Sequence, residues 1–524
     1  MKSGKKEFLS LLCKLYMVAL LVALPLYTGE GYWNLGDTKY MLFKNVSCLC
    51  LGPWLAVGIC GTDMRSFRKW RKAVSMMDLA MAAYGIIVVL SALLSDYGQL
   101  AWKGYGGWYM GAFSQLLFVG IYFVISRGYD GARWPLYLGE IALFLVTLFG
   151  LLHRLGIDPL KLLVYWSYRD WEYSHMLSTL GNINWLCGYY SVALAFFAVH
   201  FLQEERIWLE AMLYVGAVAA FVLLAIQGSQ GGWLILMVCV ASCLFLGWGR
   251  LAVLKRVCGL LTGFFFCMPI MGYLMKIRGN KAAVVLDGNI YGRVGWHVWL
   301  IAGGICVTAY VWLWRKGRIL DGRRAGRLGK AVLLGGIGVC MSAVLIFLLG
   351  RGIDDSFGNG RGFLWRIALE SFEAADVKDK LLGAGPDCYG EAVFNRLGAG
   401  SDVWKGDHWE NAVYTNAHNE FLSQLCNVGI FGTVSYLAIF LIGLYRCWRG
   451  IRTGQGGEEE SGDGGAGGKA DSYELWVGLL AIAMYGAHSL ISFQQVLNAP
   501  FLFLVLGLCE ERLRRGGHHE VEEV

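Results

Sequence analysis

The sequence predicts an all-α polytopic membrane protein with about fourteen transmembrane helices. Of its 524 residues, 56% are hydrophobic and 16% are charged, and the mean hydropathy is +0.49, which is too apolar for a soluble domain of ordinary composition. The apolar residues fall in unbroken runs of about 20, the length that a helix needs to cross a bilayer. Strands of a membrane barrel would alternate at every second residue instead, so the runs are predicted to be helices.

The composition also excludes several classes of site. The fifteen cysteines lie mostly within the apolar runs, without paired metal spacings, and are expected to be small packing residues. No HExxH, Walker loop, paired CxxC or Asp-rich metal motif occurs, so no metal and no cofactor are expected. The net charge of +7 is carried mainly by short loops between the runs, where orientation in the bilayer explains it without a nucleic-acid partner.

Residues 1–330 are predicted to form transmembrane helices one to ten with short loops. A basic head precedes the first span at about 8–28, and the loop after the second span carries five further basic residues, so the positive-inside rule places the N-terminus in the cytoplasm. Spans three and four then enclose an outer loop at 96–107. The other loops in this part that are predicted to be outer are 154–180, 227–232 and 276–295.

Residues 331–445 are predicted to form helix eleven, a long extracytoplasmic loop (about 351–420) and helix twelve. This loop is the one long polar passage with the composition of a site. Residues 446–474 begin with basic residues and continue as a Gly-rich, acidic stretch, which predicts a flexible cytoplasmic linker. Residues 475–524 are predicted to be a helical hairpin, joined at the outer face by residues 494–498, and a tail. Both termini are thus expected in the cytoplasm.

Within the long loop, a Gly-Asn-Gly turn at 358–360 precedes apolar residues at helical spacing, which places Arg361 at a helix N-terminus. Free backbone N–H groups there favour an anion, and an arginine beside them is favourable if a phosphate lies between. The alternative is an arginine that binds a lipid headgroup. Arg366 lies four residues before Glu370, so it is either a second ligand or one half of a surface ion pair.

His418 lies where the long loop becomes helix twelve, with Asn416 or Asn419 available as the N-cap. The helix dipole disfavours an imidazolium at this end, so the ring is expected to be neutral at physiological pH and able to act as a base or an acceptor. The alternative for an interfacial histidine is a headgroup contact. His408 lies in the same loop and is a further candidate by position.

Three motifs in this region carry a resemblance to a known family. They are Arg361-x-x-x-Trp365, the Leu-Gly-Ala-Gly-Pro-Asp turn at 382–387, and Asn-Ala-His-Asn-Glu-Phe-Leu at 416–422 followed by Gly-Ile-Phe-Gly at 429–432. Their order, and their position at either end of a late outer loop, resemble the O-antigen ligase and polymerase family. The segment 178–184 is similar to another recurrent segment of that family.

The resemblance implies a glycosyltransferase in the bacterial cytoplasmic membrane. Such proteins take a glycan from an undecaprenyl-diphosphate-linked glycan donor at the outer face and pass it to a glycan, lipid-glycan or protein acceptor, with inversion and without a metal. His418 would then accept the proton of the acceptor hydroxyl, and Arg361, with Arg366, would hold the diphosphate. The basic residues Arg278 and Arg293 of the outer loop at 276–295 are candidates for a second phosphate contact. The supporting residues are expected to be Asn416, Asn419, Glu420 and Trp365.

One position departs from the family pattern. After Ser229 the family often has arginine, whereas this chain has Gln230, which can donate hydrogen bonds to a phosphate but carries no charge. The diphosphate site must then be completed by another group, such as Arg293, or the substrate differs.

The sequence leaves the acceptor and one other class of function open. Polymerisation or ligation of a surface polysaccharide ranks ahead of transfer to a protein hydroxyl. A lipid-linked glycan flippase or transporter would place charged residues near the bilayer midplane, and only Lys14, Lys44, Asp78 and Glu140 are candidates for such positions. A third alternative is a non-catalytic assembly partner, in which His418 is replaceable.

Overall fold

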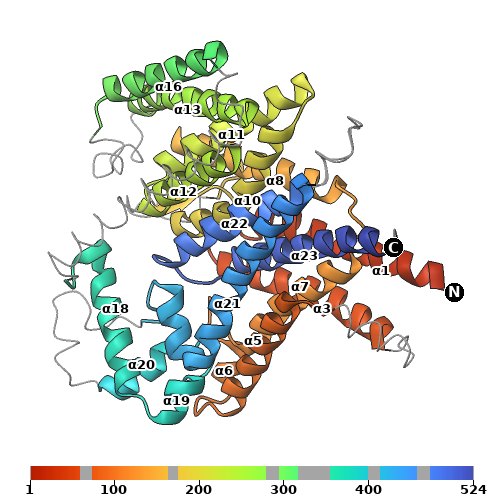
Figure 1. The fold of residues 1–524 in the computed structure, drawn as a ribbon. Coiled ribbons are helices and arrows are strands. Elements are labelled where there is room, and N and C mark those ends of the chain that lie inside the picture. Colours follow the sequence, from red (N-terminus) through yellow and green to blue (C-terminus); the bar gives the residue numbers. More distant parts are fainter. Residues whose placement is uncertain are drawn as a thin grey trace. The chain divides into compact units, whose positions relative to one another are not determined.

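The computed structural model describes residues 2–59, 74–162, 175–248, 250–278, 294–316, 354–398, 414–456 and 473–522, and most of them are helical (Figure 1). The described part contains one small sheet, in which β1 (Met176–Leu177) pairs antiparallel with β2 (Gly181–Asn182). The predicted all-α class is thereby confirmed for these residues. Predicted helix eleven lies outside them.

Each of the other predicted spans coincides with a helix. In chain order these helices are α1 (Lys2–Val18) with its continuations η1 (Ala19–Ala23) and α2 (Leu24–Leu26), α3 (Leu35–Ile59), α5 (Met76–Leu93), α7 (Ala112–Gly128), α8 (Trp134–Arg154), α10 (Ile183–Gln203), α11 (Ile207–Ile226), α12 (Gln230–Gly247), α13 (Leu251–Ile277), α16 (Trp296–Lys316), α21 (Glu420–Gly456), α22 (Tyr473–Ser489) and α23 (Ala499–Glu522). Within the described ranges, ten helices are long and apolar enough to cross a membrane. Helices α7, α22 and α23 are not among the ten, so the count of fourteen stays a prediction.

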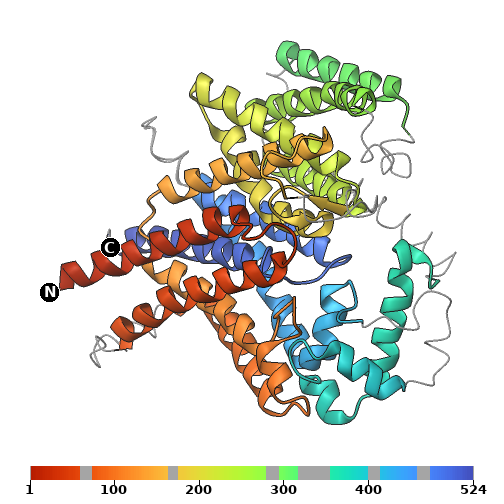
Figure 2. The ribbon, with the colours of Figure 1, turned by 180° about the vertical axis from the view of Figure 1, so that it is seen from behind.

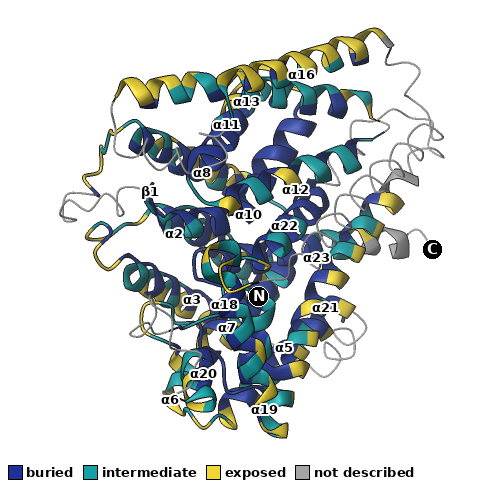
Figure 3. Ribbon diagram, turned by 90° about the vertical axis from the view of Figure 1, so that its left-hand side faces the viewer, coloured by how far each residue is buried: buried dark blue, intermediate teal, exposed yellow. Residues whose placement is uncertain are grey.

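Large apolar side chains are exposed on several of these helices. On α16, Ile301 is 61% exposed, Ile305 64% and Trp312 52%, and Figure 3 shows exposed residues along this helix. Soluble proteins rarely leave such a surface in water, whereas lipid covers it without cost because the acyl chains are equally apolar. Exposure of this kind therefore supports a polytopic membrane protein.

The chain divides into two compact units. The first comprises Met1–Leu24, Gly36–Gly139 and Asp354–Val524, and the second comprises Pro25–Leu35 and Glu140–Ile353. In the first unit α7 packs against α23, and α21 packs against α5 and α22, so the two ends of the sequence share one core (Figure 2). In the second unit α10 is buried along nearly its whole length among its neighbours. The long loop and the C-terminal hairpin belong to the first unit.

Asp78 is the centre of a charged cluster in the first unit. It forms a capping box with Ser75 at the start of α5 and accepts a hydrogen bond from the Tyr122 hydroxyl at 2.8 Å. It also pairs with Arg127 at 2.8 Å and with Arg514 at 2.6 Å. Arg127 and Arg514 lie in segments predicted to face the cytoplasm, so their shared contact with Asp78 agrees with the predicted alternation of loops. The absolute orientation of the chain stays a prediction.

Asp78→Asn is expected to lower the free energy of unfolding by about 3 to 5 kcal/mol, because two part-buried arginines lose the carboxylate that they share. Asp130→Asn is the matched control: Asp130 pairs with Lys14 at 2.7 Å but its side chain is 39% exposed, so its loss should cost about 1 kcal/mol or less. Thermal unfolding of both variants in one detergent compares them. Equal losses of stability in the two variants would contradict the conclusion that the ion pairs of Asp78 stabilise this unit more than the ion pair of Asp130 does.

The other charges considered for deep positions also have partners. Lys14 pairs with Asp130, Lys44 lies over the Tyr40 ring at 5.6 Å, and a Glu140 carboxylate oxygen lies 2.8 Å from His200 Nδ1. Partnered charges of this kind are common structural elements. They give no specific support to a charged transport path.

Helix α21 extends past the predicted boundary at residue 445. It continues to Gly456, where Arg446 pairs with Glu510 of α23 at 2.8 Å and Cys447 and Ile451 are buried. The first part of the predicted flexible linker, 446–474, is therefore helical because it packs against the C-terminal hairpin. Residues 457–472 lie outside the described ranges.

Candidate active site

The described part of the long loop folds into three helices beside α21 in the first unit (Figure 1). They are α18 (Phe357–Glu373), α19 (Val377–Leu382) and α20 (Tyr389–Leu397). Leu364, Ile367, Ala368 and Ser371, the face predicted from helical spacing, are all buried, which confirms that prediction. The loop therefore has its own apolar core and can hold side chains in fixed positions.

A left-handed turn sets the position of Arg361. Gly358, Asn359 and Gly360 have φ angles of 60°, 64° and 86°, so regular helix begins at Arg361, as predicted. Arg361 Nη1 donates to the Gly358 carbonyl at 2.7 Å, and its Nε donates to the Ile491 carbonyl at 3.0 Å. The guanidinium is thereby fixed between the start of α18 and the connection from α22 to α23.

Two asparagines hold His418 at the start of α21. Asn419 is the N-cap, because its Oδ1 accepts hydrogen bonds from the N–H groups of Phe421 and Leu422 at 3.0 and 3.2 Å. Asn416 Oδ1 accepts from the His418 N–H at 3.0 Å. His418 itself has a φ of 46°, a left-handed conformation that costs a non-glycine residue about 1 to 3 kcal/mol and often marks a functional site.

The surroundings of His418 keep its imidazole neutral. Burial, together with the positive charge of Arg361, lowers the pKa of His418 to about 4. The ring packs edge-on against Phe493, with centroids 5.1 Å apart. The sequence predicted a neutral ring from the helix dipole, but burial is the larger cause. The structure also brings Arg361 and His418, which come from separate motifs, within electrostatic reach of each other.

Asp387 is a buried acid in the Gly-rich turn between α19 and α20. Its φ is 61°, its side chain is almost fully buried, and its Oδ2 accepts the N–H groups of Tyr105 at 2.7 Å and Met110 at 2.9 Å. Burial raises the pKa of Asp387, the two N–H donors lower it and the Glu420 carboxylate raises it, so that the resulting pKa is about 7. An acid with a pKa near neutrality in a pocket is typical of functional positions.

Two close backbone contacts leave no space for a side chain at Gly383 or at Gly429. A Cβ atom at Gly383 would collide with the backbone of Asn427, and one at Gly429 would collide with the backbone of Leu381. Gly383 and Gly429 have φ angles of 78° and 67°, which also favour glycine. The glycines at 383 and 429 are thus explained by the close approach of α19 to a kink in α21.

Asp387→Asn should stabilise the protein at alkaline pH. The folded state keeps this proton up to about pH 7, whereas an unfolded chain releases it near pH 3.9, so stability falls as pH rises between these values. Asparagine keeps an oxygen for the two N–H groups and removes the charge. The gain should approach about 4 kcal/mol at pH 8 and vanish at pH 4. Thermal unfolding across this pH range measures it.

Asp379→Asn is the control for that experiment, because Asp379 is ion-paired with Arg396 and its loss should lower the unfolding temperature at pH 8. A fall in unfolding temperature at pH 8 for Asp387→Asn as well would contradict the assignment of a costly buried charge.

A hydrogen-bonded network connects Glu420 with three glutamines. Glu420 accepts from Gln424 Nε2 at 2.8 Å and from the backbone N–H of Gln494. The Tyr84 hydroxyl donates to Gln115 Oε1 at 3.0 Å, and Gln115 Nε2 donates to Gln494 Oε1 at 2.7 Å. Helices α5, α7 and α21 and the connection from α22 to α23 each contribute, so the network fixes these elements relative to one another.

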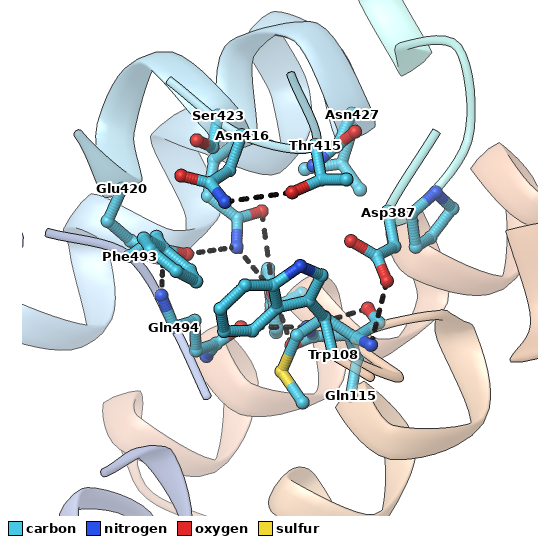
Figure 4. A pocket seen from close by; sticks show the side chains of 15 residues that line it. Trp108, Gln115, Asp387, Thr415, Asn416, Glu420, Ser423, Asn427, Phe493 and Gln494 are labelled. Atoms are coloured by element: carbon cyan, nitrogen blue, oxygen red, sulfur yellow. Dashed lines mark hydrogen bonds between the residues drawn. The ribbon is translucent and has the colours of Figure 1, made fainter. Parts of the chain in front are cut away.

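These groups line a narrow pocket with a free volume of about 30 Å³, room for about two water molecules. Figure 4 shows Asp387 on one side of the pocket and Glu420, Phe493 and Gln494 on the opposite side, with Trp108 across it. The Phe493 ring packs edge-on against the Trp108 ring, with centroids 4.9 Å apart. The same ring also packs against the imidazole of His418. Phe493 is therefore a wall shared by the pocket and by the His418 site.

Arg366 and Trp365 lie on the same helix as Arg361 but have different surroundings. Arg366 makes two hydrogen bonds to Asp355, at 2.9 and 2.6 Å, and pairs with Glu370 at 3.0 Å. The predicted surface ion pair is thus present, and a ligand role for Arg366 stays a prediction. Trp365 contacts Phe357 and the buried cluster of the loop, and its Nε1 has no hydrogen-bond partner among the described residues.

Three further candidates are not tested by this geometry. Gln230 is exposed at the start of α12 in the second unit, where Ser229 caps the helix. Arg293 and His408 lie outside the described residues. Within the described ranges, no group of three or more His, Cys, Asp or Glu side chains is placed to hold a metal ion.

Several residues of the site were not predicted. Trp108, Phe493 and Gln494 line the pocket, and the charge of Arg361 acts on His488 as well as on His418. One sequence feature pointed to the C-terminal residues of the site: the polar run at 494–498, in a connection predicted to lie at the outer face of the membrane.

No protein-family model matches the chain, and no curated protein matches it significantly. The family resemblance therefore rests on the motifs at 361–365, 382–387 and 416–432 themselves.

Proposed function

We propose that this chain is a membrane glycosyltransferase that transfers or polymerises undecaprenyl-diphosphate-linked glycan at the outer face of the cytoplasmic membrane, as a surface polysaccharide ligase or polymerase. The observation that carries the proposal is that Arg361 and His418 both contact the connection from α22 to α23, Arg361 at Ile491 and His418 at Phe493. The charge of Arg361 also acts on His418. A fixed cation and a neutral imidazole are the two groups that departure of a diphosphate and attack by a hydroxyl require.

Arg361 would hold the donor diphosphate. The side chain stands at the start of α18 and is oriented by two backbone carbonyls. As the bond between the anomeric carbon and the diphosphate oxygen breaks, negative charge develops on that oxygen. A preorganised guanidinium beside it stabilises the charge without reorganising.

His418 would accept the proton of the attacking hydroxyl. The hydroxyl oxygen forms the new bond to the anomeric carbon, the diphosphate leaves with the bonding electron pair, and the proton passes to the imidazole. In the free protein His418 is a weak base because its pKa is about 4. A bound diphosphate would offset the charge of Arg361, raise the pKa of His418, and so strengthen the base only when donor is present.

The direct test is release of undecaprenyl diphosphate from a purified lipid-linked glycan in proteoliposomes. Release without added ATP or metal is expected, and the size of the product separates polymerisation from a single transfer. A protein acceptor would appear as a glycosylated polypeptide instead. Movement of the glycan across the bilayer while still attached to its lipid would overturn the proposal in favour of a flippase.

A further inference from the structure

Helix α19 leaves an apolar face exposed outside the predicted spans. Val377 is 74% exposed and Leu381 is 36% exposed, and side chains four residues apart lie on the same face of a helix. Single exposed apolar side chains are common on protein surfaces, so the meaning of this face depends on what lies beside it. Two independent measures place it at the outer boundary of the lipid.

The first measure is the end of α5. Its candidate span ends at Leu93, and the loop that follows is predicted to be outer. Lys378 of α19 donates through Nζ to the Leu94 carbonyl at 3.1 Å and pairs with Asp96 at 2.9 Å. Helix α19 therefore lies at the level at which α5 leaves the membrane.

The second measure is the length of α21. Its candidate span, Glu420–Thr453, has 34 residues, whereas about 20 residues are enough to cross the hydrocarbon. The first basic residue of α21 is Arg446, and counting about 20 residues back from this predicted cytoplasmic end reaches residue 426 or so. Because a Cβ atom at Gly429 would collide with the Leu381 backbone, α19 adjoins α21 at the outer boundary as well.

The exposed face of α19 continues the apolar strips of its two neighbours. Helix α19 packs against both α5 and α21 (Figure 1). Ile86 and Leu90 of α5 and Ile430 and Val434 of α21 are between 41% and 60% exposed. Acyl chains cover such strips without cost because they are equally apolar. A cover that follows the strips to the ends of α5 and α21 also reaches the adjoining face of α19.

We propose that α19 lies in the outer-leaflet interface of the bilayer, with Val377 and Leu381 inserted among the lipid headgroups and the first acyl carbons. Interfacial helices bury their apolar face about 5–10 Å into this boundary. Gly383 follows α19 directly and fits against the backbone of Asn427, so the lipid contact fixes the height of the turn at 382–387 above the membrane. The proposal does not depend on the proposed enzymatic activity.

Fluorescence quenching in nanodiscs of phosphatidylethanolamine and phosphatidylglycerol tests this position in the full chain. A fluorescent amino acid replaces Val377 by codon suppression, and the quenchers are a lipid with a nitroxide at its fifth acyl carbon and aqueous iodide. The matched controls carry the same fluorophore at Glu373, which is exposed at the end of α18, or at Val434 in the strip of α21. At position 377 nitroxide quenching should be at least about twofold stronger, and iodide quenching about twofold weaker, than at position 373.

Two results would overturn the proposal. Iodide quenching at position 377 as strong as at position 373 would mean that the face of α19 lies in water. Protection from iodide without nitroxide quenching would mean that protein, such as a second copy of this chain, covers the face instead of lipid.

Leu381→Asp tests whether the helix face itself inserts. With the fluorophore at position 377, this substitution should reduce nitroxide quenching by about twofold, because a charged side chain draws the face toward water. With the fluorophore at position 434 quenching should be unchanged, which shows that the fold persists. Unchanged nitroxide quenching at both positions would contradict insertion of this face.

Discussion

Arg361→Gln is expected to slow glycan transfer by about 100- to 1,000-fold, the usual effect of removing one preorganised donor from a developing negative charge. Glutamine retains hydrogen-bond donors but not the charge. Both carbonyl contacts of Arg361, to Gly358 and Ile491, involve exposed or half-buried loop ends, so the fold should persist. Release of undecaprenyl diphosphate, measured under single-turnover conditions, reports the chemical step.

Arg366→Gln is the comparison for Arg361. It lies on the same helix, but its guanidinium is neutralised by Asp355 and Glu370 and is 40% exposed. Nearby Asp355 holds the pKa of Arg366 above its usual value. Less than about a tenfold loss is expected, because an exposed ion pair contributes little. A loss as large as that of Arg361→Gln would instead assign Arg366 to the diphosphate site.

His418→Gln should reduce transfer by about 100- to 10,000-fold, the range that general base catalysis supplies. His488→Gln is the matched control, because the charge of Arg361 acts on both histidines but only His418 lies at the start of α21 beside the pocket. It should keep most of the activity. A larger loss of transfer activity in His488→Gln than in His418→Gln would instead assign the general base to His488 of α22.

The pH dependence of kcat/KM should follow His418. Because the neutral ring is the active form, activity is present above the pKa of about 4 and is lost as pH falls through it. Arg361→Gln removes a positive charge that lowers this pKa, so the acid limb of its residual activity should move to higher pH. A wild-type limb near pH 6.5, the ordinary value for histidine, would contradict the burial of the ring.

The helices and the two central residues could be predicted from the sequence because each depends on local information. Hydropathy defines a span within about 20 residues, the Gly-Asn-Gly turn sets the start of α18, and Asn419 caps α21. The ion pair of Arg366 with Glu370 follows from a spacing of four. Its stronger pairing with Asp355 does not, because the left-handed turn at 358–360 brings Asp355 back along the helix.

The pocket could not be predicted, because its residues come from segments far apart in the chain. Tyr84 and Gln424 are 340 residues apart, and Gln115 and Gln494 are 379 apart. Glutamines and a tryptophan near span ends have ordinary structural explanations when each is considered alone. Only the packing of the N-terminal and C-terminal helices in one unit reveals that Trp108, Asp387 and Gln494 face one space.

A double-mutant cycle between Arg361 and His418 tests most directly whether the two act as one catalytic site. Transfer is measured for wild type, Arg361→Gln, His418→Gln and the double variant in the same proteoliposomes. If both groups serve one transition state, the double variant should be about as slow as the slower single variant, as in other catalytic groups that act as a unit. If the two losses multiply in full, or if neither variant is slower than wild type, Arg361 and His418 do not form the active site proposed here.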